Sequence, residues 1–299
     1  MKGMFKKFIL KLMSLGFFNW LGDELFCKWK FELVLGYKPN FREPSTFNEK
    51  INYLKLYATD SSMARYVDKF EVRSYIEEKI GSQYLVPLIA KYDSVEDITW
   101  QNLPNRFVLK CSSGSGGNVI CKNKVELDIK KEKEKLKYYC NYNYYYVNRE
   151  RQYKNIKPCI VCEEFISDTD ITPDDYKVYC FSGKARLLEF HIDRFAVKEH
   201  LCDYYDELLN KLDFRWGTKP SNIELPYKDM AKKIIELSEL IAKDFLHARV
   251  DWYVVANKIY FGEITLHNGG GYEKFNSYDD DLWLGSFLHI PCKNEKQEM

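Results

Sequence analysis

The chain has 299 residues and a formal net charge of +1, and its residues are 45% hydrophobic, 16% aromatic and 30% charged. This length suits one large domain or two to three small lobes, and the composition argues against a membrane-embedded or a disordered protein. The balanced charge argues against a nucleic-acid partner, because a protein that tracks phosphates carries an excess of basic residues.

Residues 1–30 combine basic residues, among them Lys2, Lys6, Lys7 and Lys11, with an apolar stretch. No small-residue cleavage site follows this stretch, and Lys11 and Asp23 interrupt it, which argues against a signal peptide and a membrane-spanning helix. The apolar residues between positions 5 and 15 follow helical spacing. Two interpretations stay open for residues 1–35: a first helix packed on the body, or a basic amphipathic helix on the inner membrane surface.

Residues 36–95 are predicted to form a helical N-terminal region. Thr46 and Glu49 have the spacing of a capping box, in which each residue bonds the backbone at the other. Residues 61–80 carry an apolar stripe at helical spacing, and Gly81 suits the end of that helix.

The pattern then changes from helical to extended. Residues 106–111 and 119–121 are predicted strands on either side of a glycine-rich loop at 112–117. A helix is predicted from about Asp128, and it runs into a tyrosine-rich tract at 138–146 before a buried strand at 159–166. The tyrosines can pack on the strands around the loop, which we favour, or stack on sugars.

The C-terminal half contains two predicted hairpins and a helix. Residues 175–181 and 185–192 flank Ser182 and Gly183, an amphipathic helix covers 227–246, and residues 249–256 and 259–265 flank a turn at Asn257. A helical front followed by strand pairs is an α+β or mixed α/β layout.

Nine cysteines, an odd number, are scattered through mostly apolar stretches. We expect buried free thiols in a reducing cytosol. Cys159 and Cys162 form a C-x-x-C pattern, but no second pair accompanies them, so buried thiols are favoured over a redox or metal site.

The glycine-rich loop is a candidate phosphate cradle, because glycine lets backbone N–H groups approach an anion closely. Extended stretches flank it on both sides, so it lacks the helix that follows a P-loop. Lys110 lies within the apolar strand just before the loop, where a buried charge needs a partner such as phosphate. The alternative is an edge-strand lysine that reaches solvent.

The last hairpin brings two carboxylates together. A turn at Asn257 places Asp251 opposite Glu263, and Arg249 shares their face. Like charges in this position need a compensator, and Mg²⁺ bound by these carboxylates and by substrate phosphates is favoured over neutralisation by Arg249 alone. A flexible polar loop at 267–271 lies beside the pair.

Together these motifs resemble the ATP-grasp superfamily, and most closely its TupA-like branch, which is associated with teichuronopeptide and surface-polysaccharide synthesis. The resemblance covers about residues 31–284, and its motifs lie at 68–73, 107–116, 161–166, 175–184, 249–251 and 263–265. It implies an α+β ATP-grasp fold whose two lobes clamp a nucleotide. The small lobe with the glycine flap would be residues 96–166 and the large lobe with the metal site residues 167–292.

The resemblance also implies residue roles. Arg249, Lys110 and Lys177 would be catalytic, although a solvated strand lysine is an equal alternative for Lys177, as is a turn pair with Asp193 for Arg194. Asp251, Glu263 and Thr265 would hold magnesium, with threonine where many members have asparagine. Substrate would meet Arg194, His191 and Asn268. The ATP-binding set, in which Lys69 can substitute for Arg73, is Lys69, Arg73, Lys110, Ser113, Gly114, Ser115, Gly116, Glu163, Glu164, Phe165, Ile166 and Asp170.

The implied reaction is ADP-forming ligation, in which ATP phosphorylates a carboxylate and an amine attacks the acyl phosphate. The implied partners are ATP, Mg²⁺, a glycan or lipid-linked sugar carboxylate such as a uronic acid, and an amino acid or other amine, in capsule, O-antigen or other surface-polysaccharide synthesis. The alternatives are a kinase acting on a sugar hydroxyl, a glycosyltransferase, and a non-catalytic scaffold that binds nucleotide or glycan. We expect the protein in the cytoplasm, where residues 1–30 could contact the inner face of the membrane.

Overall fold

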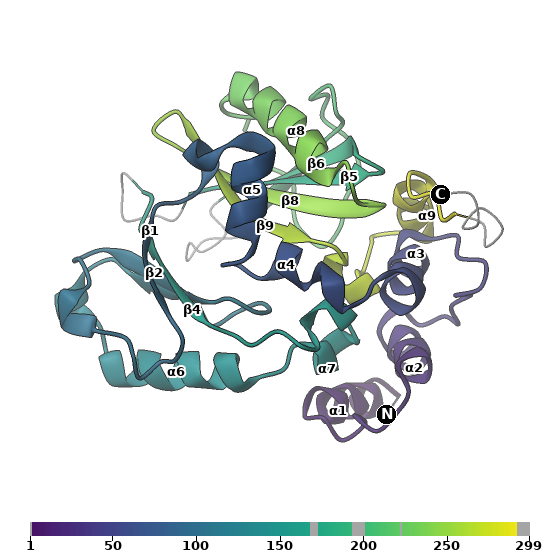
Figure 1. The fold of residues 1–299 in the computed structure, drawn as a ribbon. Helices are drawn as coiled ribbons and strands as arrows, with labels where there is room; N and C mark the ends of the chain where they lie inside the picture. The colour runs from purple at the N-terminus through teal and green to yellow at the C-terminus, as the bar shows by residue number, and fades with distance from the viewer. Residues whose placement is uncertain (1, 168–172, 193–200, 222, 292–299) are drawn as a thin grey trace.

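Two antiparallel sheets frame the protein, and a helical region leads into them (Figure 1). The computed structural model describes residues 2–167, 173–192, 201–221 and 223–291. Asp170 and Arg194, both predicted site residues, lie outside the described residues.

The N-terminal region is a run of short helices. Its main elements are α1 (Lys2–Ser14), α2 (Asp23–Leu35), α3 (Phe47–Tyr53), α4 (Ala64–Val67) and α5 (Val72–Ile80). A π-helical turn, Leu54–Ala58, follows α3, and 3-10 turns cover Ser61–Met63 and Ser82–Tyr84. The predicted capping box of Thr46 and Glu49 is confirmed at the start of α3.

The single helix predicted over 61–80 is wrong, because the backbone leaves the helical conformation at Asp68. The Asp68 carboxylate accepts bonds from the backbone N–H groups of Phe70 (2.9 Å) and Glu71 (3.0 Å). A side chain that bonds the N–H groups two and three residues ahead competes with helix continuation, so α4 ends and α5 begins anew.

The small sheet has the strand order β1-β4-β2-β3. Its strands are β1 (Leu88–Tyr92), β2 (Phe107–Cys111), β3 (Val119–Cys121) and β4 (Ile160–Glu164). Because β1 pairs with β4, the predicted helical region 36–95 ends in a strand of this sheet, which corrects that prediction. Helix α6 (Ile129–Asn141) packs on one face through the buried Leu136, and α7 (Tyr145–Asn148) follows it.

The large sheet has the order β7-β6-β5-β8-β9 and two chemically different faces. Its strands are β5 (Asp175–Phe181), β6 (Lys184–Ile192), β7 (Leu201–Tyr205), β8 (His247–Val255) and β9 (Lys258–Thr265). One face is apolar and packs under α5 and α8 (Lys228–Ala242), the helix expected over 227–246 (Figure 1). The opposite face carries polar side chains and, beside them, a second apolar cluster that packs on α3 and on α9 (Tyr278–Ser286).

Two further expectations are met within the described residues. The eight cysteines among them are free thiols, seven of them buried. None of the helices in the same part of the chain is both long and apolar enough to span a bilayer.

Candidate functional site

The glycine flap joins β2 to β3. Gly114 (φ 75°), Gly116 (φ 91°) and Gly117 (φ 71°) adopt left-handed backbone conformations that favour glycine. Tyr144 lies against Gly114 and Tyr139 against Gly116 and Gly117, so closely that an added Cβ would approach their rings to 2.8 Å or less. The tyrosine-rich tract therefore packs on the flap, as the favoured interpretation predicted.

Lys69 reaches the flap from the turn between α4 and α5. Its Nζ donates to the Gly114 carbonyl oxygen at 2.6 Å and lies 3.8 Å from Glu263 Oε2. The neighbouring Asp68 accepts a bond from Ser112 Oγ at 2.6 Å, which fixes this turn to the end of β2. Lys69 thus stands between the flap and one of the predicted metal carboxylates.

Lys110 and Arg73 share one carboxylate. Lys110 Nζ is 2.6 Å from Glu163 Oε2, and Arg73 Nη1 is 3.0 Å from Glu163 Oε1. The edge-strand alternative for Lys110 is wrong, because β2 lies between β4 and β3. Arg73 also donates to the Val86 carbonyl oxygen at 2.9 Å, so it joins the Glu163 carboxylate of β4 to the segment that precedes β1.

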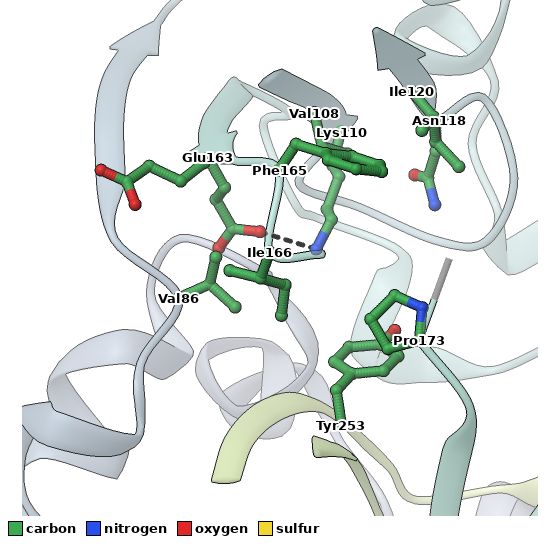
Figure 2. Close-up of a pocket in the computed structure, with 11 residues that line it drawn as sticks. Val86, Val108, Lys110, Asn118, Ile120, Glu163, Phe165, Ile166, Pro173 and Tyr253 are labelled. Carbon is green, nitrogen blue, oxygen red and sulfur yellow. Dashed lines mark hydrogen bonds and ion pairs between the residues drawn. The ribbon is translucent and has the colours of Figure 1, made fainter. Parts of the chain in front are cut away.

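An apolar pocket lies between the two sheets. Phe165 and Ile166, which follow β4, stand on one side. Pro173, which precedes β5, and Tyr253 of β8 stand across from them (Figure 2). The Lys110–Glu163 pair closes its inner end (Figure 2). A flat, apolar wall with one polar end suits a heteroaromatic ring. The remaining lining residues are Val86, Val108, Asn118, Ile120 and Glu164.

A row of charged residues crosses the polar face of the large sheet. Glu189 on β6 pairs with Lys177 on β5, Lys177 with Asp251 on β8, and Asp251 with Glu263 on β9. Directly paired residues share a face of the sheet, so these four charged side chains form a row. Their signs run negative, positive, negative and negative, which leaves the carboxylates of Asp251 and Glu263 side by side. Lys177 is 5% exposed and its Nζ is 3.9 Å from Asp251, so the solvated-lysine alternative is wrong.

Arg249 bridges the adjacent carboxylates. Its Nε is 2.6 Å from Asp251 Oδ1 and its Nη2 is 3.4 Å from Glu263 Oε1. Arg249 also bonds the Asn268 side-chain oxygen. The predicted pairing of Asp251 with Glu263 is confirmed, and neutralisation by Arg249 is present in this structure.

The donor set at this position consists of oxygen atoms, which suits Mg²⁺. Asp251 and Glu263 supply carboxylates, and Thr265, which lies opposite Arg249, supplies a hydroxyl group. A cation bound here would compete with Arg249 for the same oxygens, so the metal role remains a prediction.

Glu189 and His191 form a buried pair beside this row. Glu189 Oε1 is 2.8 Å from His191 Nε2, and Glu189 Oε2 accepts a bond from Tyr179 at 2.7 Å. Burial alone raises the pKa of Glu189, but the hydrogen bond and charge of His191, the charge of Lys177 and the Tyr179 hydroxyl together lower it well below the usual range. Glu189 therefore stays ionised.

A polar cavity collects these groups. Gly114 and Ser115 of the flap, Lys177, His191, Arg249, Glu263, Thr265 and Asn268 all line it. Sequence reasoning missed several other lining residues, among them Glu189, Glu150, Glu273, Tyr153 and Trp216. Glu189 could have been found, because a hairpin that turns near Gly183 places it opposite Lys177. The others come from loops and from a 3-10 turn, Arg151–Tyr153, which periodicity does not place.

A family model described as TupA-like ATPgrasp matches residues 49–289. Among solved structures, the D-alanine–D-alanine ligase from Bacillus anthracis is 18% identical, with a TM-score of 0.42 over 69% of this chain and 58% of that one. The L-amino acid ligase from Bacillus licheniformis is 14% identical, with a TM-score of 0.45 over 79% and 53%. The chain thus spans little more than half of either structure. A search of the curated proteins finds no match.

Proposed function

Because the chain belongs to the TupA-like ATP-grasp family, whose model covers most of it, we propose that it is an ADP-forming ligase that joins a carboxylate to an amine. The α+β ATP-grasp fold expected from the sequence is confirmed by this membership. The observation that carries the proposal is that Arg249 and Glu263 line one polar cavity together with the flap residues Gly114 and Ser115. Asp251 contacts Arg249, and Lys69 contacts both Gly114 and Glu263.

In this proposal the nucleotide base occupies the apolar pocket. Phe165 and Ile166 supply apolar surface, and the backbone of the strand end at Glu164 supplies the polar groups that a base edge needs. The phosphates then extend toward Lys110, Lys69 and the flap. Backbone N–H groups of a glycine loop and two lysines suit the positioning and charge neutralisation that phosphoryl transfer demands.

Magnesium would be held by Asp251 and Glu263, with Thr265 beside them. Bound there, it would supply positive charge to the transferring phosphoryl group. Arg249, which already contacts both carboxylates, is placed to stabilise negative charge on the reacting carboxylate as it forms the acyl phosphate. Lys177 stands next to Asp251 and extends the positive surface into the cavity.

The remainder of the polar cavity is proposed as the site of the carboxylate and amine substrates. Aromatic side chains at its wall, Tyr144, Tyr153 and Trp216, suit a sugar ring, and Glu189 with Glu273 suits an amine cation. Burial raises the pKa of Glu273, so a bound ammonium group would relieve the cost of its charge. His191 and Asn268 line the same cavity. We therefore propose a glycan carboxylate, such as a uronic acid, as the acid substrate in surface-polysaccharide synthesis.

The test is release of ADP and phosphate with Mg²⁺, a panel of uronic acids and a panel of amino acids. Release should require both substrates, and mass spectrometry should find an amide product. Asp251→Asn with Glu263→Gln should lower turnover by about a hundredfold or more, since both groups act on the charge of the transferring phosphoryl group.

The matched control exchanges two exposed acids, Asp229→Asn with Glu224→Gln, whose side chains are 100% and 91% exposed. Equal loss in both variants would contradict the proposed site. A stable phosphorylated product that forms without amine would identify a kinase instead, and AMP with pyrophosphate would exclude the ADP-forming ligase.

A further inference from the structure

Helix α1 has apolar residues on two opposite faces. Met13 is 2% exposed and packs in a cluster with Phe26 and Phe31 of α2. Met4, Phe8 and Leu15 follow i, i+4 and i+11 spacing, so they share a different stripe, and they are 77%, 57% and 62% exposed. The packed face explains why the helix folds onto the body, and it leaves the exposed face unexplained.

The turn after α1 continues the exposed surface. Phe17 and Trp20 are 63% and 77% exposed, although Phe18 between them packs edge-on against Trp29 at 4.9 Å. The buried Arg149 guanidinium donates to the carbonyl groups of residues 18, 19 and 21 at 3.1 to 3.5 Å. The turn is therefore held in place, and the two exposed rings are presented by an ordered backbone.

All the charged side chains of α1 and the turn after it are basic. Residues 1–22 contain Lys2, Lys6, Lys7 and Lys11 and no acidic residue. The first acid, Asp23, bonds Tyr145 at 2.5 Å and lies 3.3 Å from Arg151, so it is engaged with the body of the protein. Lys7 and Lys11 are exposed on the helix that carries the apolar stripe.

We infer that α1 and the following turn form a docking surface for an anionic lipid bilayer, on which the helix lies parallel to the membrane plane. Phe8, Leu15, Phe17 and Trp20 would enter the boundary between headgroups and acyl chains, and Lys7 and Lys11 would pair with lipid phosphates. A helix of 13 residues is too short to span, which suits an in-plane position. Figure 1 shows α1 at the edge of the molecule, remote from the large sheet, so a flat surface can reach it.

Lipid is favoured over a second copy of the chain because of the charge pattern. Two copies that met through this face would bring their lysines together without acids to pair with them, whereas an anionic bilayer neutralises them. Aromatic residues flanked by lysines are also the composition of helices that bind at the membrane interface.

The experiment is sedimentation of the full chain with vesicles of phosphatidylcholine, with and without phosphatidylglycerol. The protein should bind the vesicles that contain phosphatidylglycerol, and added salt should weaken binding. Lys7→Gln with Lys11→Gln, and separately Phe8→Ser with Trp20→Ser, should each weaken binding by about tenfold or more. The control, Val125→Ser with Leu208→Ser, removes residues that are 92% and 76% exposed elsewhere and should bind like the wild type.

All variants should keep the wild-type melting temperature, because the exchanged side chains are exposed. Binding that is equal in all variants would overturn the inference. A second result would also overturn it: the wild type forms a dimer without vesicles, Phe8→Ser with Trp20→Ser dissociates this dimer, and the wild type does not bind lipid.

Discussion

A lysine within an apolar strand needs a partner, and Lys110 finds it in Glu163 of the neighbouring strand. The sequence predicted the need from burial but could not name the partner, since Glu163 and Glu164 are adjacent and about 50 residues away. Register decides between them: β2 pairs with β4 so that Val108 lies opposite Glu163, and Lys110 shares that face. Glu164 falls on the other face and is exposed.

This arrangement predicts a large difference between two neighbouring substitutions. Glu163→Gln should lower the free energy of unfolding by about 2 kcal/mol or more, because it leaves Lys110 and Arg73 without their shared negative charge at a site of low exposure. Glu164→Gln, the control, should change it by less than about 0.5 kcal/mol. Urea unfolding without nucleotide measures both. Similar losses for the two variants would show that the shared carboxylate contributes little.

At the scale of elements, the sequence predicted the pairing of Asp251 with Glu263 in the C-terminal hairpin correctly, but it did not reveal the bulge that produces this pairing. The turn contains two residues with positive φ, Ala256 and Asn257, and on its own it would place Asp251 opposite Gly262. A bulge between Asp251 and Trp252 shifts the register by one residue, so that Asp251 meets Glu263. Glycine suits the bulge, because a Cβ at Gly262 would lie 3.0 Å from the Asp251 carbonyl oxygen. Alternation predicts which face a residue occupies, but it does not reveal a bulge.

The glycine flap depends on an element that the sequence did not connect to it. Gly116→Ala should lower the free energy of unfolding by about 1 to 2 kcal/mol, since alanine is strained at a φ of 91° and its Cβ would meet the Tyr139 ring at 2.6 Å. ATP affinity, measured by calorimetry, should fall as well if the flap binds phosphate.

Adding Tyr139→Ala should recover the steric part of this loss and leave the backbone strain. Gly22→Ala is the matched control, because Gly22 has a φ of −62° and open space at its Cβ position. No coupling between Gly116→Ala and Tyr139→Ala in a double-mutant cycle would contradict the packing of the tyrosine tract on the flap.

At the scale of the whole molecule, the N-terminal region and the large lobe form one unit. The buried Lys55 donates to the Gly270 carbonyl oxygen at 2.7 Å, and Asn52 donates to that of Gly271 at 2.7 Å, so α3 and the π-helical turn after it support the loop that lines the polar cavity. Sequence periodicity separated residues 36–95 from the large lobe because these contacts join positions more than 200 apart. The two C-terminal hairpins and the helix over residues 227–246 follow from local patterns, whereas these long-range contacts form only in the folded chain.

His247 lies where these two parts meet, and it makes stability depend on pH. Its ring lies 5.3 Å from both Phe47 of α3 and Phe181 of β5, and its Nδ1 is bonded to the Leu266 carbonyl oxygen at 3.0 Å. Burial lowers the pKa of His247 from 6.5 to about 3. Between these values the unfolded chain binds a proton that the folded protein does not. Stability should therefore fall as the pH drops below 6.5, by about 1.4 kcal/mol per pH unit, until the folded-state value is reached.

His247→Asn keeps a donor for Leu266 and removes the titration, so its stability should fall less between about pH 6.5 and about pH 5 than that of the wild type, by about 2 kcal/mol. His289→Asn exchanges an exposed histidine and should follow the wild type. Burial also lowers the pKa of His267, which is retained in all three proteins, so the His247 variant should keep part of the pH dependence. Urea unfolding at both pH values measures the difference. An unchanged pH dependence in His247→Asn would contradict the prediction. It would mean that the folded protein takes up the proton on His247 without disturbing the packing of α3 on the large sheet.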